Sequence, residues 1–391
     1  MTLFQSAKHL RSFSKFINTH KMKYTPNIEI KNNIANKSAG LGIFATNAIE
    51  KNVEILRIPL SLYAPYSAAS AISNARSNKD IYDGISQFVS SRSSIKNVTI
   101  DEDNRLMQVL CTSLNLVISL LYYKDEYAKL LYSNITNNDF NHPLLFKNQN
   151  DIRLKVLERT YAAYKINLQR KLCFDFCNEV LGDGNDMSLS FIQAMSFVSS
   201  RALSGEEFPF TLCPVMDFVN HGEDDKVNTI HSFDNKDGSI ILRTIKDVAE
   251  EEEILISYGR DRDAASFLTL YGFAPHNTII TNANTSTRVR IRVRDNFVTL
   301  NISSDMTEAI KKLFVLSGNL IDPIGLLQEE LKEREEIEKD IEEEIEKHHD
   351  TSNQQSNTNI NTSIWIQTAR KLREQEKGAI HSLLKKIQSY Q

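Results

Sequence analysis

The chain has 391 residues, of which 41% are hydrophobic and 25% are charged, a composition that excludes a collagenous, disordered or membrane-embedded protein. Its length predicts more than one structural unit. Glycine and proline are scarce, at 13 and 8 residues, which argues against a turn-rich all-β protein and predicts that helices dominate. The net charge of −4 leaves no basic surplus for a phosphate backbone, so we expect no nucleic-acid partner.

The four cysteines, Cys111, Cys173, Cys177 and Cys213, form no paired CxxC motif. They indicate neither a disulfide framework nor a zinc cluster, and we interpret them as buried thiols in a reducing compartment. The longest apolar run, residues 109–123, is too short and too polar to span a bilayer. It predicts a buried helix, and we expect no membrane association.

Residues 1–26 contain five basic and no acidic side chains, with apolar residues at helical spacing. This pattern is similar to a mitochondrial presequence, and it also suits a first structural helix with a solvated basic face. We favour the structural helix because the chain continues into strand-like sequence without a clear processing boundary. This interpretation places the protein in the cytoplasm, with the nucleus as a second location and the mitochondrion as the alternative.

Residues 27–66 predict short strands joined by turns, because brief apolar runs are separated by polar breaks. Residues 67–195 have few glycines or prolines and carry apolar residues at helical spacing, which predicts a helical insertion. Strand-like sequence returns in residues 196–276, at 208–219, 229–233, 240–244 and 253–258. Strands that flank a helical block, instead of alternating with single helices, predict an α+β fold.

Residues 277–391 predict a mostly helical C-terminal domain. It begins with a hairpin over residues 287–300, whose strand of alternating arginines either receives an acidic partner or faces solvent. Residues 329–347 hold eleven acidic and four basic residues, a net charge of −7 on a thin apolar stripe; they predict a long solvated helix or a partner-binding acidic arm. Residues 351–363 are rich in Asn, Gln, Ser and Thr and predict a disordered loop. A final amphipathic helix follows.

Five short motifs carry the candidate chemistry. They are Gly40-Leu41-Gly42, Ser200-Arg201-Ala202-Leu203, the Asp217-x-x-Asn220-His221 segment, Tyr258-Gly259 and Tyr271-Gly272-Phe273. The first lacks the third glycine and the strand-helix-strand context of a dinucleotide fingerprint, so it is a weak signal for a nucleotide site. Each motif taken singly also fits a turn, a cap or the end of a strand.

In this order and at these spacings, the motifs resemble those of the SET-domain protein methyltransferases. Within that family they resemble the subgroup typified by the Rubisco large-subunit lysine methyltransferase. The resemblance covers nearly the whole chain. It implies a SET fold of short-stranded sheets split by a helical insertion, followed by a substrate-binding-like helical domain. It also implies S-adenosyl-L-methionine as the methyl donor, no metal, and a lysine side chain of a protein substrate as the acceptor. We expect a monomer.

The resemblance assigns donor-binding roles to eight residues, which are Ala39, Gly40, Leu41, Arg201, Asp217, Asn220, His221 and Tyr258. An arginine fork suits the methionine carboxylate, an asparagine can accept from the α-ammonium, and backbone groups at His221 suit the adenine edge. Asp217 would support the pocket wall or be purely structural. Tyr258 corresponds to the catalytic tyrosine, whose hydroxyl orients the amine. The family often has an acidic residue where this chain has Ala39.

Four further residues are implied on the substrate side: Tyr271 and Phe273 would line the lysine channel, beside Leu203 and Met216. A histidine-methylating relative carries Asn at the position of Leu203 and Trp at the position of Met216. The apolar side chain of Leu203 offers no hydrogen bond to an imidazole. We therefore favour lysine as the acceptor.

The zinc-binding cysteine clusters that flank many histone-directed SET domains are absent from the sequence. This favours a non-histone substrate such as a ribosomal protein or translation factor. The alternatives are a catalytically silent SET-fold binding module and a protein-histidine methyltransferase.

Overall fold

The structure is a computed structural model. It describes residues 23–24, 27–32, 41–93, 100–121, 142–146, 151–182, 186–204, 210–223, 225–259, 262–275, 288–293, 296–301, 313, 323–351 and 356–389. The predicted N-terminal helix lies outside these residues except for Lys23–Tyr24, which form a short strand, β1, instead of helix. Ala39 and Gly40 also lie outside the described part.

The chain forms two compact units. The first comprises Met1–Phe140 and Lys171–Arg260, and the second comprises Asn141–Arg170 and Asp261–Gln391. This division differs from the predicted boundaries, which placed all of residues 67–195 in one insertion. Helical spacing identifies a helix but not the core that it faces. Residues such as Leu157 and Ile166 are buried in the hydrophobic core of the second unit.

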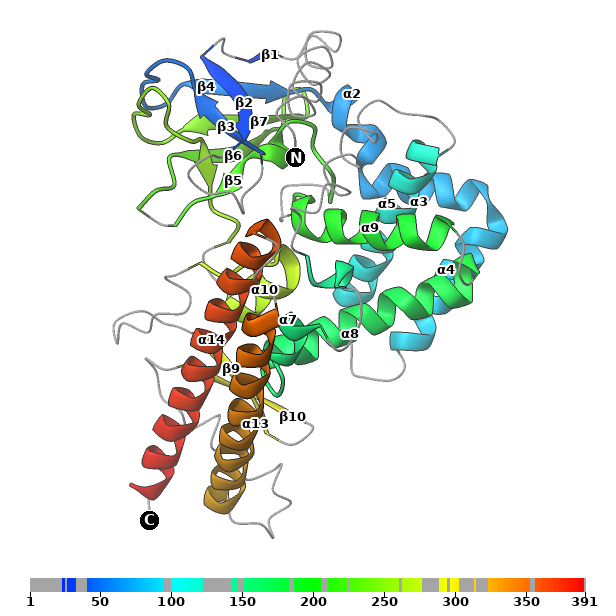
Figure 1. Cartoon of the computed structure of the whole chain (residues 1–391). Coiled ribbons are helices and arrows are strands. Elements are labelled where there is room, and N and C mark those ends of the chain that lie inside the picture. Colours follow the sequence, from blue (N-terminus) through cyan, green and yellow to red (C-terminus); the bar gives the residue numbers. More distant parts are fainter. Residues whose placement is uncertain are drawn as a thin grey trace. The chain divides into compact units, whose positions relative to one another are not determined.

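Short strands, most of them in antiparallel pairs, build the sheets of the first unit (Figure 1). The largest sheet has the order β1-β4-β7-β6, with β4 at Glu54–Ile58, β6 at Thr229–Asp234 and β7 at Ser239–Thr244. A second sheet pairs β2 (Ile28–Asn32) with β3 (Leu41–Ala45). A third pairs β5 (Asn220–His221) with β8 (Leu255–Ile256) in parallel. These elements confirm the short strands that the sequence predicts over residues 28–58 and 229–244.

The helices of the first unit pack around α5, which contacts α3, α4 and α9. Their bounds are α2 Leu60–Tyr63, α3 Ala68–Ser77, α4 Lys79–Ser93, α5 Ile100–Leu121 and α9 Asp186–Arg201. Leu110, Leu114 and Val117 of α5 are buried, which confirms the predicted buried helix in its described part. No helix among the described residues has the length and apolar character needed to cross a membrane.

Residues 208–219 were expected to be strand, and the described part of this segment is not. Thr211 makes isolated bridges to Ser67 and Leu203, and Met216–Phe218 form a 3-10 turn, η4. A continuous apolar run indicates burial but does not distinguish a strand from another buried segment. Pro214 also lacks the N–H that a strand ladder needs.

The second unit is mostly helical. Its elements are η2 Pro143–Leu145, α7 Ile152–Lys155, the first part of α8 (Tyr161–Phe176), α10 Ala264–Tyr271, β9 Arg288–Val293, β10 Asn296–Asn301, α13 Pro323–Thr351 and α14 Ser356–Gln388. Strands β9 and β10 pair in antiparallel register from Arg288↔Asn301 to Val293↔Asn296. This pairing confirms the predicted hairpin.

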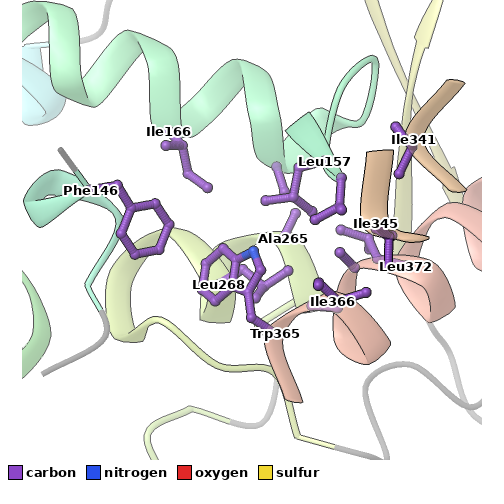
Figure 2. Packing of buried hydrophobic residues seen from close by; sticks show 14 residues of the cluster. Phe146, Leu157, Ile166, Ala265, Leu268, Ile341, Ile345, Trp365, Ile366 and Leu372 are labelled. Carbon is purple, nitrogen blue, oxygen red and sulfur yellow. The ribbon is translucent and has the colours of Figure 1, made fainter. Parts of the chain in front are cut away.

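Trp365 occupies the core of the second unit, beside Leu268 and Phe146 (Figure 2). Its ring meets that of Phe146 edge-on at a centroid distance of 5.1 Å. The buried indole N–H donates to the carbonyl oxygen of Arg153 at 2.7 Å. The single tryptophan of the chain is therefore a reporter of packing in this unit.

Helix α13 is less solvated than its composition suggests. Its stripe residues Leu331, Ile341 and Ile345 are buried, and its carboxylates pair with basic residues of α14, as Glu342 does with Arg370. Helix α14 begins at Ser356, inside the segment predicted to be disordered over 351–363. Adding turns to the start of a helix costs little free energy once its later turns are fixed by packing. The low helix propensity of this segment therefore does not prevent α14 from beginning there.

Candidate functional site

The parallel pair β5–β8 brings the central motifs of the first unit together. Asn220 lies opposite Leu255 and His221 opposite Ile256. The same segment joins β3, because the N–H of Ile254 donates to the carbonyl oxygen of Ile43 at 2.8 Å. Residues from three distant parts of the sequence therefore meet at the ends of short strands.

Tyr258 is held by two of the other predicted site segments. Its hydroxyl donates to the carbonyl oxygen of Val219 at 2.9 Å and accepts from Nη1 of Arg201 at 3.0 Å. Its backbone N–H donates to Nδ1 of His221 at 3.1 Å, and the two rings lie 5.3 Å apart. Nδ1 of His221 is therefore an acceptor and does not carry a proton. Arg201, His221 and Tyr258 therefore form one contact group.

Arg201 is the last residue of α9 and is partly buried. Within the described residues, its hydrogen bond to Tyr258 is made by one of its terminal nitrogens, and no carboxylate of this part of the chain lies within salt-bridge distance of it. A guanidinium has five N–H donors in a fixed plane. The remaining donors can bind a carboxylate in bidentate geometry.

Asn220 is buried, and its amide orientation is set by two acceptors. Nδ2 donates to the carbonyl oxygen of Leu41 at 3.1 Å and to Oε1 of Glu253 at 2.7 Å. Both amide hydrogens are thereby used, and Oδ1 has no hydrogen-bond donor among the described residues. An acceptor of this kind suits a ligand ammonium.

Glu253 is a site residue that the sequence analysis missed. It is the last of four consecutive glutamates, residues 250–253, and such a run is typical of a solvated turn. The one signal available was its position directly before the buried residues Ile254 and Ile256. The sequence alone does not distinguish the one glutamate of the four whose side chain turns inward.

Gly42 allows this cluster to close. A Cβ at this position would lie 2.5 Å from Oε1 of Glu253 and 3.0 Å from Nδ2 of Asn220. Real Cβ atoms do not approach so closely, so a side chain at position 42 would displace Glu253 or Asn220. The absence of a side chain at Gly42, the second glycine of the GxG motif, thus allows the polar groups of Glu253 and Asn220 to lie close to the backbone there.

Asp217 lies in η4 and is buried. Its Oδ1 accepts from the backbone N–H of Cys213 at 3.4 Å, and its Oδ2 has no hydrogen-bond partner within the described residues. Burial raises the pKa of this carboxyl well above its usual range. Val215, the residue directly before η4, has φ +75°, a strained conformation for a β-branched side chain.

The predicted substrate residues are divided between the two units. In the first, Leu203 pairs with Thr211 through two backbone hydrogen bonds of 2.8 and 3.1 Å, and Met216 is buried. In the second, the rings of Tyr271 and Phe273 lie 5.5 and 5.8 Å from that of Phe267, and 6.0 Å from each other, between centroids. Tyr271 and Phe273 are thus in contact with each other within the second unit.

The first unit fits a zwitterionic amino-acid ligand. Arg201 supplies unused donors for a carboxylate, and Asn220 supplies an acceptor for an ammonium. Among the described residues, no group of three or more His, Cys, Asp and Glu side chains is arranged to hold a metal ion. All four cysteines are buried, as predicted.

The architecture is the SET fold. The chain aligns with the structure of Rubisco LSMT bound to AdoMet at a TM-score of 0.59 and 12% identity, covering 98% of this chain and 92% of that one. It aligns with the SET domain of LSMT bound to lysine and AdoHcy at a TM-score of 0.57 and 13% identity, covering 96% and 90%. The resemblance to SET-domain proteins inferred from the motifs is confirmed for the fold.

Sequence comparisons point to a more particular group. Residues 204–312 match the family model of cytochrome c lysine N-methyltransferase 1. A SET domain-containing protein 8 of Schizosaccharomyces pombe is 38% identical over 88 residues, which is 22% of this chain and 19% of that protein. A cytochrome c lysine N-methyltransferase 1 of Candida glabrata is 34% identical over 73 residues, 17% of this chain and 13% of that protein. The matches therefore span less than one fifth of either curated relative.

Proposed function

We propose that this protein is an S-adenosyl-L-methionine-dependent protein-lysine N-methyltransferase. The observation that carries the proposal is the hydrogen bond between Arg201 and the hydroxyl of Tyr258 in a SET fold. That contact joins the residue suited to the donor's carboxylate to the residue suited to the reacting amine. The ligands named for the LSMT structures, AdoMet, AdoHcy and lysine, support the same chemistry.

The proposed donor site uses side chains of complementary charge and hydrogen bonding. Arg201 would bind the methionine carboxylate, and Oδ1 of Asn220 would accept from the α-ammonium. Backbone groups at His221 would meet the adenine edge. Leu41, with Ala39 and Gly40 before it, would complete the turn around the donor, and Asp217 would support the pocket wall.

The donor supplies a sulfonium-bound methyl group, and the protein must supply a neutral, aligned amine. Lysine has an ordinary pKa near 10.4, so the enzyme has to lower it by desolvation and by nearby positive charge. The Tyr258 hydroxyl already donates to Val219, and therefore offers a lone pair to an amine N–H. Accepting from that N–H turns the nitrogen lone pair towards the methyl group, which is catalysis by orientation.

The acceptor and substrate are further parts of the proposal. Leu203 and Met216 favour lysine over histidine, and the family resemblance assigns Tyr271 and Phe273 to the lysine channel. We propose a non-histone substrate, with ribosomal proteins and translation factors as one class. The names of the matching family model and of one relative add cytochrome c as a specific candidate. We further propose a monomer located in the cytoplasm, and in the nucleus as a second site.

Methyl transfer from labelled S-adenosyl-L-methionine tests the activity directly. Purified cytochrome c, ribosomes and histone octamers would be incubated with the wild type, with Tyr258→Phe and with Tyr63→Phe. Tyr63 is a matched control, since its buried hydroxyl also donates to a carbonyl, that of Gly238. We expect Tyr258→Phe to lose on the order of 100-fold in rate, comparable to removing one transition-state hydrogen bond, and Tyr63→Phe to retain activity.

Two outcomes would count against the proposal. If no protein is labelled by the wild type beyond the Tyr258→Phe background, the enzymatic function is wrong. If calorimetry then finds no binding of S-adenosyl-L-methionine, the silent binding module is the better description. Mass spectrometry of the labelled protein would distinguish methyl-lysine from methyl-histidine.

A further inference from the structure

Glu253 is fixed in place more firmly than a surface glutamate of an acidic turn would be. Its backbone forms a bridge with Phe44 of β3, and its carbonyl oxygen accepts from Nδ2 of Asn228 at 2.8 Å. The next residue, Ile254, is buried and bonded to Ile43. The main chain therefore directs this one side chain towards Asn220.

The contact between Glu253 and Asn220 has a directional consequence. A primary amide has two donor hydrogens on nitrogen and two acceptor lone pairs on oxygen. Leu41 and Glu253 both offer oxygen acceptors, so only one amide orientation satisfies them: Nδ2 faces both, and Oδ1 faces away. Without the carboxylate, the amide could rotate about its last bond and present a donor where an acceptor is needed.

Gly42 supplies an independent observation. The missing Cβ at this position leaves room for Oε1 of Glu253 and Nδ2 of Asn220 at the same place. Three elements, β3, β5 and the segment before β8, thus converge on the Asn220–Glu253 hydrogen bond. Such convergence is typical of a side chain whose orientation matters.

We infer that Glu253 is a positioning residue that holds the Asn220 amide with its oxygen presented to the α-ammonium of the methyl donor. This inference rests on the proposed function, because the ammonium belongs to that donor. Glu253 acts through Asn220, and its carboxylate need not touch the ligand. The Gly42–Asn220–Glu253 group is the part of the first unit that would recognise the donor's amino group.

The test compares two ligands that differ only at the amino group. S-adenosylhomocysteine carries the ammonium, and its α-keto analogue keeps the carboxylate and the adenosine but lacks it. Affinities for both would be measured by calorimetry on the full chain. The variants are Glu253→Met, which removes the acceptor, Glu253→Gln, which keeps an acceptor oxygen, and Glu250→Met, an exposed glutamate of the same run.

We expect Glu253→Met to weaken binding of S-adenosylhomocysteine by about tenfold to 100-fold, the range for hydrogen bonds to charged groups, and to leave binding of the keto analogue unchanged. Glu253→Gln should keep most of the preference for the ammonium, and Glu250→Met should behave as the wild type. Gly42→Ala, which would push a methyl group into the same hydrogen bond, should also reduce the preference.

Several results would overturn the inference. Equal weakening of both ligands by Glu253→Met, or an unchanged preference, would make Glu253 merely structural. Loss of the preference in Glu253→Gln to the same extent as in Glu253→Met would mean that charge and not amide orientation is recognised. If the wild type binds neither ligand, the proposed function itself fails, which is a distinct result.

Discussion

Arg334 of the second unit and Arg201 of the first unit are used in opposite ways. In the second unit Arg334 is only 2% exposed, and all three of its side-chain nitrogens are engaged, with Glu330 at 2.9 Å, Glu376 at 2.8 Å and the carbonyl oxygen of Arg159 at 3.0 Å. In the first unit Arg201 makes one hydrogen bond within the described residues, to Tyr258. A fully paired guanidinium serves the fold, whereas one with unused donors is available to a ligand.

The pairing of Arg334 explains its place in the second unit. Glu330 lies on α13 and Glu376 on α14, and Glu376 also accepts from the backbone N–H of Tyr161 at the start of α8 at 3.0 Å. Three helices of this unit are therefore joined by one buried network. Removing one member of such a network leaves a buried charge without compensation, which is strongly destabilising.

The largest expected effect is therefore on stability in the second unit. Arg334→Met should lower the free energy of unfolding by about 3 to 5 kcal/mol, because Glu330 and Glu376 lose their partner in a buried site. Urea unfolding followed by Trp365 fluorescence measures this unit specifically, since the chain has no other tryptophan.

Lys377→Met is the matched control for this prediction. Lys377 pairs with Glu338 between the same two helices, but its side chain and that of Glu338 are 23% and 28% exposed. A partly exposed pair is worth about 1 kcal/mol or less. A cost for Arg334→Met no greater than that for Lys377→Met would contradict the contrast between the two arginines.

A smaller effect is expected on ligand binding in the first unit. Arg201→Met should weaken S-adenosylhomocysteine by about tenfold to 100-fold through loss of a charge-assisted hydrogen bond to the carboxylate. The free energy of unfolding should change little, since Arg201 pairs with no carboxylate of the described residues. Calorimetry and urea unfolding on the same samples separate the two quantities.

Arg92→Met provides the comparison for Arg201. Arg92 is also in the first unit, and it pairs with Glu179 and Asp175. Its replacement should leave donor affinity unchanged. Equal losses of affinity in the two variants would show that Arg201 has no special relation to the donor.

Much of the fold follows from local patterns in the sequence. The strand of alternating arginines predicted the β9–β10 hairpin, and a long apolar run predicted the buried part of α5. Patterns of this kind do not reveal which core a helix joins, and so they did not indicate that residues 141–170 group with the second unit. They also do not show whether a buried segment such as 210–219 finds a strand partner.

The candidate site was predictable where residue type determines chemistry. The family resemblance assigned Arg201, His221 and Tyr258 to one site, and hydrogen bonds join them in the structure. Glu253 was missed because its role depends on a tertiary contact with Asn220 and on the space left by Gly42. Four successive glutamates look alike in the sequence, and only the pairing of strands distinguishes the one that turns inward.

The last expected effect concerns the pH dependence of stability, and here the two units should differ in sign. Burial lowers the pKa of His142 in the second unit to about 3, below its unfolded value near 6.5. Its unfolded form therefore binds the proton, and stability should be lost as the pH falls from about 6.5 towards 3. Burial raises the pKa of Asp217 in the first unit, so the folded form holds the proton there.

For Asp217 the stability contribution is present below the unfolded pKa of about 4 and is lost as the pH rises towards the folded value. Asp217→Asn should remove this loss of stability with rising pH. The loss amounts to at most about 1.4 kcal/mol in the free energy of unfolding per pH unit, because one proton is involved. Urea unfolding by circular dichroism between pH 4 and 7 measures the slope. An unchanged slope in Asp217→Asn would mean that the carboxyl is ionised in the fold, and that its second oxygen has a partner which neutralises the cost of burial.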